Sequence, residues 1–177
     1  MENVTNKPST AGIALKWGGI AGLISIIFSA ILYITSQASN KWLSSLGFLF
    51  LVGGIVYAIK EFKSQSGGHI SFGEGLGLGS LVSAVIGLLS ATFSAFYIKF
   101  VDNSFVKTTL QQQRLELEQQ GMDDAQIDQA LSVAENFMGP GALFLFGFLG
   151  TLLMGFIFSL IISAIMKNER KDLNKFV

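Results

Sequence analysis

The sequence predicts an all-α integral membrane protein with a four-transmembrane-helix bundle, and three observations support this fold class. Half of the 177 residues are hydrophobic and only 14% are charged, whereas soluble domains carry about 25% charged residues. Four long segments contain no Asp, Glu, Lys, Arg or His. All Trp and Tyr residues lie near the ends of these segments, where amphipathic rings meet a membrane interface. These interface anchors are Trp17, Tyr33, Trp42, Tyr57 and Tyr97.

Each of the four segments is long enough to cross a bilayer as a helix. About 20 residues suffice, because an α-helix rises about 1.5 Å per residue and the hydrocarbon core is about 30 Å thick. The second segment is short, and it fits if Trp42 and Lys60 lie among the lipid headgroups. The first segment could instead be a cleaved signal peptide, although such a peptide has an apolar region of only about 7–15 residues. The predicted spans are residues 12–36, 42–60, 72–98 and 140–166.

Basic residues are distributed unequally between the two sides of the predicted membrane domain, which comprises residues 1–177. Eight of the 12 lie in the N-terminal segment, the loop after the second span and the tail 167–177. Cytoplasmic segments are enriched in Lys and Arg, so we predict that both termini are cytoplasmic and that residues 99–139 lie outside. The eight residues are Lys7, Lys16, Lys60, Lys63, Lys167, Arg170, Lys171 and Lys175.

The outer loop 99–139 carries seven acidic and three basic residues, and we predict that it forms a helical hairpin. Residues 103–120 are rich in Gln, Leu and Glu and predict a helix that Gly121 ends. A second helix begins after a cap at Asp123 and extends to about Phe137. Two interpretations of the hairpin are open: it rests on the bilayer or the bundle, or it provides a docking surface for a partner.

Residues that cap helices mark the beginnings of the third and fourth spans. Ser71 followed by Glu74 is the pattern of a capping box, in which two backbone N–H groups are bonded reciprocally. Pro140 stands at the first helical position of the fourth span, where its missing N–H group is harmless. Glu74 is also the only acidic residue that touches a span, so a cation or proton site is the alternative to the cap.

Small residues recur at every fourth position in the first, third and fourth spans. Residues four apart share one face of a helix, and small side chains let helix backbones approach closely in lipid. We therefore predict that the third and fourth spans pack along these stripes, with Phe, Ile and Leu facing lipid. The same pattern would also serve an interface between two copies of the chain. The predicted packing residues are Gly18, Gly22, Gly75, Gly79, Ser83, Gly87, Gly147, Thr151, Gly155 and Ser159.

The sequence contains no motif for catalysis, for a metal or for a cofactor. There is no Cys and a single His, His69, which excludes Cys-based and His-cluster metal sites. The glycines between Gly73 and Gly79 lack the Lys of a phosphate-binding loop and the spacing of a dinucleotide fingerprint. The span interiors carry no ionisable group of the kind that ion-coupled transporters use. The net charge of zero gives no reason to expect a nucleic acid partner.

Three short stretches of the chain resemble a known family. They are residues 70–75 (ISFGEG), 122–127 (MDDAQI) and 159–165 (SLIISAI). Over roughly residues 10–172 the chain resembles the bacterial four-span membrane proteins of domain-of-unknown-function family 4199. This resemblance implies the inner membrane of a Gram-negative bacterium, and it implies no known activity and no catalytic residues.

We expect a non-enzymatic membrane protein that acts as a scaffold or accessory subunit of a membrane assembly. Spans without reactive groups, packing stripes and an outer helical loop favour this function. The expected partners are the lipid bilayer and, beyond it, other membrane proteins or further copies of the chain, and no cofactor is expected. The alternative is a small transporter or channel for a neutral or weakly polar solute. Its water-filled path would be lined by Ser83, Ser90, Ser94 and Thr151.

Overall fold

The chain is helical throughout the part that the computed structural model describes, residues 8–168, apart from short connections. Within that range there is no strand, and one isolated antiparallel bridge joins Ile70 to Asn168. The predicted all-α class is therefore confirmed. The helices are α1 (Thr10–Ile34), α2 (Lys41–Ser45), α3 (Gly47–Gln65), α4 (Phe72–Phe100), α5 (Ser104–Gln119), α6 (Asp124–Phe137) and α7 (Pro140–Met166).

Four helical segments are long and apolar enough to cross a membrane. α1, α4 and α7 form one segment each, whereas α2 and α3 together form the segment Lys41–Gln65. Leu46, which joins α2 to α3, has right-handed helical dihedral angles (φ −62°, ψ −22°), so the helical course continues through it. The segment extends past residue 60 because Phe62 is buried and Gln65 bonds back to Glu61 one turn earlier.

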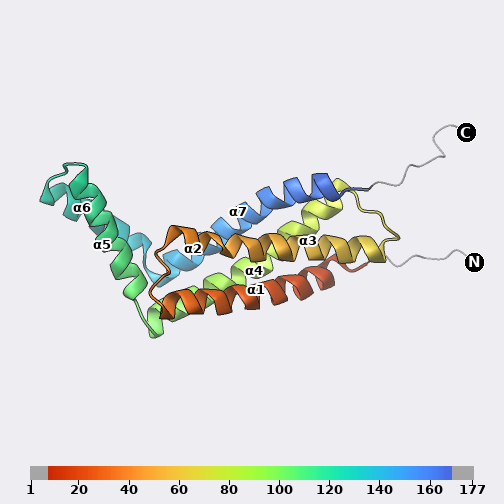
Figure 1. Cartoon of the computed structure of the whole chain (residues 1–177), viewed down its shortest axis with the longest axis horizontal. Helices are drawn as coiled ribbons and strands as arrows, with labels where there is room; N and C mark the ends of the chain where they lie inside the picture. The colour runs from red at the N-terminus through yellow and green to blue at the C-terminus, as the bar shows by residue number, and fades with distance from the viewer. Residues whose placement is uncertain (1–7, 169–177) are drawn as a thin grey trace, which may run out of the picture.

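The four long helices lie side by side, and α4 is the central one (Figure 1). It packs most extensively on α7 and then on α1, while α3 contacts α1, α4 and α7. One end of the bundle holds the beginning of α1, the end of α7 and the α3–α4 loop, and we call it the proximal end. The α5–α6 pair projects from the opposite end, the distal end, where α5 meets α4 and α6 meets α7.

The buried core lies mainly in the proximal half of the bundle. Ile55 and Ile59 of α3 belong to one cluster with Leu78 and Val82 of α4, and all four side chains are 0% exposed. The outer faces of the helices are apolar as well: Leu153 of α7, for example, is 61% exposed. Exposed aliphatic side chains on this scale are expected where lipid, rather than water, surrounds a bundle.

The α3–α4 loop holds the end of α7. The Ile70 N–H donates to the carbonyl of Asn168 (3.1 Å), and the Asn168 N–H donates to the carbonyl of Ile70 (2.9 Å). The side-chain amide of Asn168 donates to the carbonyl of Gly68 (2.9 Å), and Lys63 Nζ donates to the carbonyl of Met166 (3.2 Å). The Lys63 bond satisfies a carbonyl that the end of α7 leaves without an intrahelical partner, and the other bonds fix the residue that follows the helix.

α5 and α6 contact each other and are joined by a turn at Gly121. Gly121 has a φ of 79°, a left-handed conformation that glycine adopts without strain. Asp123 caps α6 by accepting a hydrogen bond of 2.8 Å from a backbone N–H in the first turn. Arg114 of α5 pairs with Asp128 of α6, and the neighbouring Ile127 is 1% exposed. Contacts between α5 and α6 themselves therefore hold these two helices together, and we call them the α5–α6 pair.

Candidate functional site

The small-residue stripes of α4 and α7 face each other, and we call this contact the α4–α7 seam. It runs antiparallel in a constant register, because four residues forward on α4 match four residues back on α7. At each level a glycine of one helix faces a small residue of the other. From the proximal to the distal end, the levels are Gly75–Ser163, Gly79–Ser159, Ser83–Gly155, Gly87–Thr151 and Ala91–Gly147.

The two backbones approach most closely at the proximal and middle levels of the seam. A Cβ atom added at Gly79 would lie 2.8 Å from Cβ of Ser159, and one added at Gly155 would overlap Ser83. Real Cβ atoms essentially never approach another atom within 3.0 Å, so no larger side chain fits at either glycine. A Cβ atom at Gly147 would lie 3.7 Å from the nearest atom of α4, so the seam relaxes at its distal level.

The hydroxyl groups in the middle of the seam bond within their own helices. Ser83 Oγ donates to the carbonyl of Gly79 (2.8 Å), and Ser159 Oγ donates to that of Gly155 (2.6 Å). The Thr151 hydroxyl bonds in the same way to the carbonyl one turn earlier (2.8 Å). A polar group in an apolar environment needs a hydrogen-bond partner. These hydroxyls find theirs in their own helix, so they need none on the facing helix.

The stripe of α1 packs differently, because larger side chains of α4 fill its glycine positions. A Cβ atom at Gly18 would lie 2.7 Å from Cβ of Val85, and one at Gly22 would lie 2.7 Å from Cδ1 of Leu89. The expectation that Phe, Ile and Leu of these helices face lipid is therefore wrong for Leu89, as it is for the buried Leu78 and Ile86 of α4. Leu89 packs inside the bundle because the glycine opposite leaves space for its side chain.

Four of the five predicted interface anchors form two stacked pairs across helices. Trp17 of α1 stacks on Tyr57 of α3 in the proximal half, with ring centroids 5.0 Å apart. Tyr33 of α1 stacks on Tyr97 of α4 towards the distal end, with centroids 4.8 Å apart. Trp42 is 87% exposed at the beginning of α2. The rings thus lie at two levels of the bundle, the arrangement expected of aromatic belts at two membrane interfaces.

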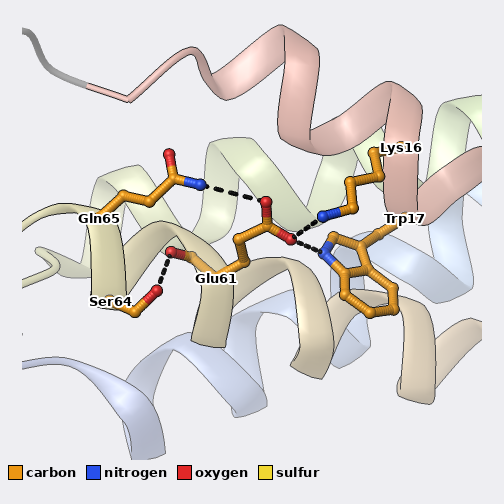
Figure 2. Close-up of polar contacts among 5 residues, drawn as sticks. All are labelled: Lys16, Trp17, Glu61, Ser64 and Gln65. Atoms are coloured by element: carbon orange, nitrogen blue, oxygen red, sulfur yellow. Dashed lines mark hydrogen bonds and ion pairs between the residues drawn. The ribbon is translucent and has the colours of Figure 1, made fainter.

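Next to the Trp17–Tyr57 stack, Glu61 of α3 binds side chains from two helices, as Figure 2 shows. Its Oε2 accepts hydrogen bonds from Lys16 Nζ (2.8 Å) and Trp17 Nε1 (2.6 Å) of α1. Its Oε1 accepts one from Gln65 Nε2 (3.1 Å), one turn along α3. We call Lys16, Trp17, Glu61 and Gln65 the proximal cluster. It ties α1 to α3, with one carboxylate and one ammonium group balancing each other's charge.

The proximal cluster is not predicted by the sequence pattern, because the apolar stretch of the second span ends at residue 60 and Glu61 is then expected in a loop. A signal was present, since Tyr57, Glu61 and Gln65 recur at the helical spacing of four. That spacing shows one face of α3, but it does not show that α1 presents Lys16 and Trp17 at the same height.

Ser71 and Glu74 form a capping box at the beginning of α4. Ser71 Oγ accepts a bond from the Glu74 N–H (3.2 Å), while Glu74 Oε2 accepts bonds from the Ser71 N–H (3.0 Å) and hydroxyl (2.9 Å). His69 lies in the loop before this cap, with Nδ1 3.3 Å from the carbonyl oxygen of Asn168. Among residues 8–168, no group of three His, Asp or Glu side chains could hold a metal ion.

A cavity of about 390 Å³ lies in the distal half of the bundle, and we call it the distal cavity. Leu51 and Ile86 bound it near the middle of the bundle, beside the tight part of the seam, and Phe105 of α5 bounds it at the distal end. Most of its wall is apolar. Five hydroxyl groups also line it, those of Ser25, Ser29, Ser44, Ser90 and Thr151, besides Tyr33.

The hydroxyl residues considered for a solute path do not form a continuous line in this structure. Ser90 and Thr151 bound the distal cavity, whereas Ser83 is fully buried against Gly155. Ser94 does not border the cavity. The distal cavity therefore ends where the seam becomes tight.

A family of known proteins matches the part of the chain that contains these features. The family model described as "Protein of unknown function (DUF4199)" matches residues 16–168. No curated protein and no solved structure matches the chain. The matched range contains the whole of the α4–α7 seam, the proximal cluster and the distal cavity. The chain therefore belongs to the DUF4199 family of proteins of unknown function.

Proposed function

We propose that this chain is a non-enzymatic membrane protein that serves as a scaffold or accessory subunit of a membrane assembly. The α4–α7 seam carries the proposal, because it leaves no room for a side chain at Gly79 or Gly155. Transporters move parts of their bundle against each other to admit a solute. Two helices in such close contact suit a support better than a moving gate.

The α5–α6 pair is the part of the chain that this support would present to a partner. It projects beyond the distal end of the bundle, and its two ends connect to α4 and α7, the helices of the seam (Figure 1). Leu115, Val133 and Phe137 of this pair are 52%, 53% and 56% exposed. Exposed apolar side chains on a projecting element favour contact with another protein or with lipid headgroups.

We infer that the membrane is an inner membrane and that the proximal end faces the cytoplasm. Lys16, Lys60, Lys63 and Lys167 belong to that end. Cytoplasmic segments are enriched in such residues, so the α5–α6 pair would face outward. Of the basic residues that support this orientation, four lie outside the described residues: Lys7, Arg170, Lys171 and Lys175.

A photo-crosslinking amino acid at Val133 of α6 tests the scaffold proposal in cells. We expect a crosslinked product of defined mass, containing either a second copy of the chain or a partner subunit. The same complex should survive mild extraction and appear in native mass spectrometry. The control is the same amino acid at Ile165 of α7, which is 76% exposed near the other end. A monomeric chain without a crosslink at Val133 would contradict the proposal.

The orientation has its own test, which the absence of Cys from the sequence makes simple. A single cysteine at Ser132 of α6 should react with a membrane-impermeant maleimide in intact spheroplasts. A cysteine at Ser64, near the proximal end of α3, should react only after the membrane is opened. The reverse pattern would place the α5–α6 pair in the cytoplasm.

The distal cavity supports a second candidate, transport of a neutral or weakly polar solute. Such transport requires the tight levels of the seam at Ser83 and Gly155 to open, since the cavity ends there. Reconstituted vesicles can be assayed for the flux of radiolabelled glycerol. Flux above that of protein-free vesicles would favour transport, and equal flux would count against it.

A further inference from the structure

We propose that the distal cavity binds an uncharged lipid-derived molecule that has a hydrocarbon body and a hydrogen-bonding oxygen. This inference does not depend on the scaffold function. The cavity volume of about 390 Å³ lies within the usual range for small-molecule sites, about 300–1,000 Å³. It corresponds to roughly a dozen groups of the size of a water molecule or a methylene, which suits a single hydrocarbon chain.

The lining of the cavity selects against charge. Phe28, Phe48, Leu51 and Ile86 form much of the wall, and none of the residues that bound the cavity in the described part of the chain is Asp, Glu, Lys, Arg or His. A charged molecule would lose its hydration here without gaining an ionic partner. An uncharged molecule with an apolar body would be favoured.

Ser90 supplies the polar contact. Its Oγ is buried and has no hydrogen-bond partner among residues 8–168. Other hydroxyls of the cavity are already bonded to the backbone: Ser25 to Ala21 (2.8 Å) and Ser44 to Ala38 (2.8 Å). Buried hydroxyls normally have partners, so the buried Ser90 hydroxyl is available to bond an oxygen of a ligand.

The position of the cavity favours a lipid-derived molecule over a water-soluble one. The cavity lies among α1, α3, α4 and α7, the helices that are long and apolar enough to cross a membrane. The molecules at the highest local concentration there are lipids and their neutral derivatives. The cavity also ends at the tight part of the seam, so it has the shape of a binding pocket that stops halfway along the bundle.

The test uses the full chain in phospholipid nanodiscs and three diazirine-bearing probes with the same hydrocarbon chain. One probe ends in an alcohol, one in a carboxylate and one in a methyl group. We expect the alcohol to label α1 residues 25–33 and α3 residues 47–51 in a saturable manner, as mapped by peptide mass spectrometry. The carboxylate and the hydrocarbon should need higher concentrations for the same labelling.

Two pairs of variants separate binding from folding. Ser90→Ala should weaken saturable labelling by the alcohol about threefold to tenfold, the effect of one hydrogen bond, and leave labelling by the hydrocarbon unchanged. Ser80→Ala is the control, because Ser80 Oγ is bonded to the Leu76 carbonyl of α4 (2.8 Å) and does not border the cavity.

Gly47→Phe should block the cavity, since Gly47 borders it and a Cβ atom there would meet no atom within 4 Å. Gly53→Phe places the same side chain on α3 in equally open space away from the cavity. This variant should bind the alcohol probe like the unaltered chain.

The proposal is overturned if labelling is not saturable, if the three probes bind alike, or if Ser90→Ala and Gly47→Phe label like their controls. Glycerol can also be tested as a competitor of labelling by the alcohol probe. If it competes at concentrations as low as those of the unlabelled alcohol, the proposal is overturned, because the occupant would then be a water-soluble solute.

Discussion

The two halves of the bundle are built from the same four long helices, yet they pack in different ways. In the proximal half, fully buried side chains such as Ile55 and Val82 fill the space around α4. In the distal half, the same helices border a cavity of about 390 Å³. The α4–α7 seam crosses both halves and relaxes along its length: a Cβ atom added at Gly79 would lie 2.8 Å from Cβ of Ser159, whereas one added at Gly147 would lie 3.7 Å from its nearest neighbour.

The difference shows that a small-residue stripe permits close packing of two helices but does not fill a bundle by itself. Where the seam is tight, α3 covers it: Ile55 Cγ2 would lie 3.1 Å from a Cβ atom at Gly79, and Leu51 Cδ1 would lie 3.6 Å from one at Gly155. Beyond Leu51, towards the distal end, the side chains of α3 border the cavity instead. The stripe determines how close two helices come, and the third helix determines whether the space beside them is filled.

We expect the largest effect on stability from substitutions in the tight half of the seam. Gly155→Leu or Gly79→Leu should destabilise the bundle by about 3 kcal/mol, because the added side chain overlaps a serine of the facing helix and must push that helix away. Gly150→Leu and Gly77→Leu are matched controls on the same helices, since a Cβ atom at either position meets nothing within 4 Å. Thermal unfolding in detergent measures the difference. Equal Tm values for the two sets would show that the seam is not a contact that stabilises the bundle.

A smaller substitution sharpens the comparison along the seam itself. Gly79→Ala should lower the stability by about 1–2 kcal/mol through overpacking. Gly147→Ala should raise it by about 0.5–1 kcal/mol, because alanine favours the helix and the added methyl group is in ordinary contact at 3.7 Å. Denaturant unfolding of the two variants should therefore give opposite signs. The same sign for both would mean that the relaxation of the seam has no energetic consequence.

The proximal cluster should contribute less than the seam. Trp17→Phe keeps an aromatic ring on Tyr57 but removes the N–H bond to Glu61, and we expect a loss of about 1 kcal/mol. Trp42→Phe is the control, since Trp42 is 87% exposed. Thermal unfolding of both variants checks the expectation. A loss as large for Trp42→Phe would indicate a general effect of removing tryptophan.

The smallest effect concerns the junction of α4 and α5 at the distal end. The hydroxyl (2.6 Å) and the N–H (2.9 Å) of Ser104 donate hydrogen bonds to Asp102 Oδ1, and these bonds, above all that of the hydroxyl, lower the pKa of the Asp102 carboxyl. Because the folded pKa is depressed, this contribution to stability is present above the unfolded pKa and is lost as the pH falls through the folded value. Ser104→Ala should raise the pKa towards its ordinary value. A ¹³C-detected NMR titration of Asp102 measures the pKa, and an unchanged value would exclude the Ser104 hydroxyl as its main cause, because the backbone N–H bond is kept in this variant.

The sequence was sufficient for features that depend on neighbours along the chain. The capping box of Ser71 and Glu74 is written in four consecutive residues, and Pro140 stands at the first residue of α7. The all-α class follows from apolar stretches of about 20 residues, because a bilayer leaves the backbone of such a stretch few alternatives to a helix. The end of the second helix was not evident from the sequence, since the charged residues Lys60, Glu61 and Lys63 interrupt the hydropathy although the helix continues to Gln65.

By itself, the sequence therefore determined that the chain forms four helical segments long and apolar enough to cross a membrane, and which of their faces carry small residues. The tertiary structure alone decided that Gly79 meets Ser159, that Glu61 of α3 binds Trp17 of α1, and that Ser90 borders a cavity. The physical reason is that a helical period depends on local backbone geometry. The distance between two helices depends instead on the side chains of every helix packed around them, including residues far apart in the chain.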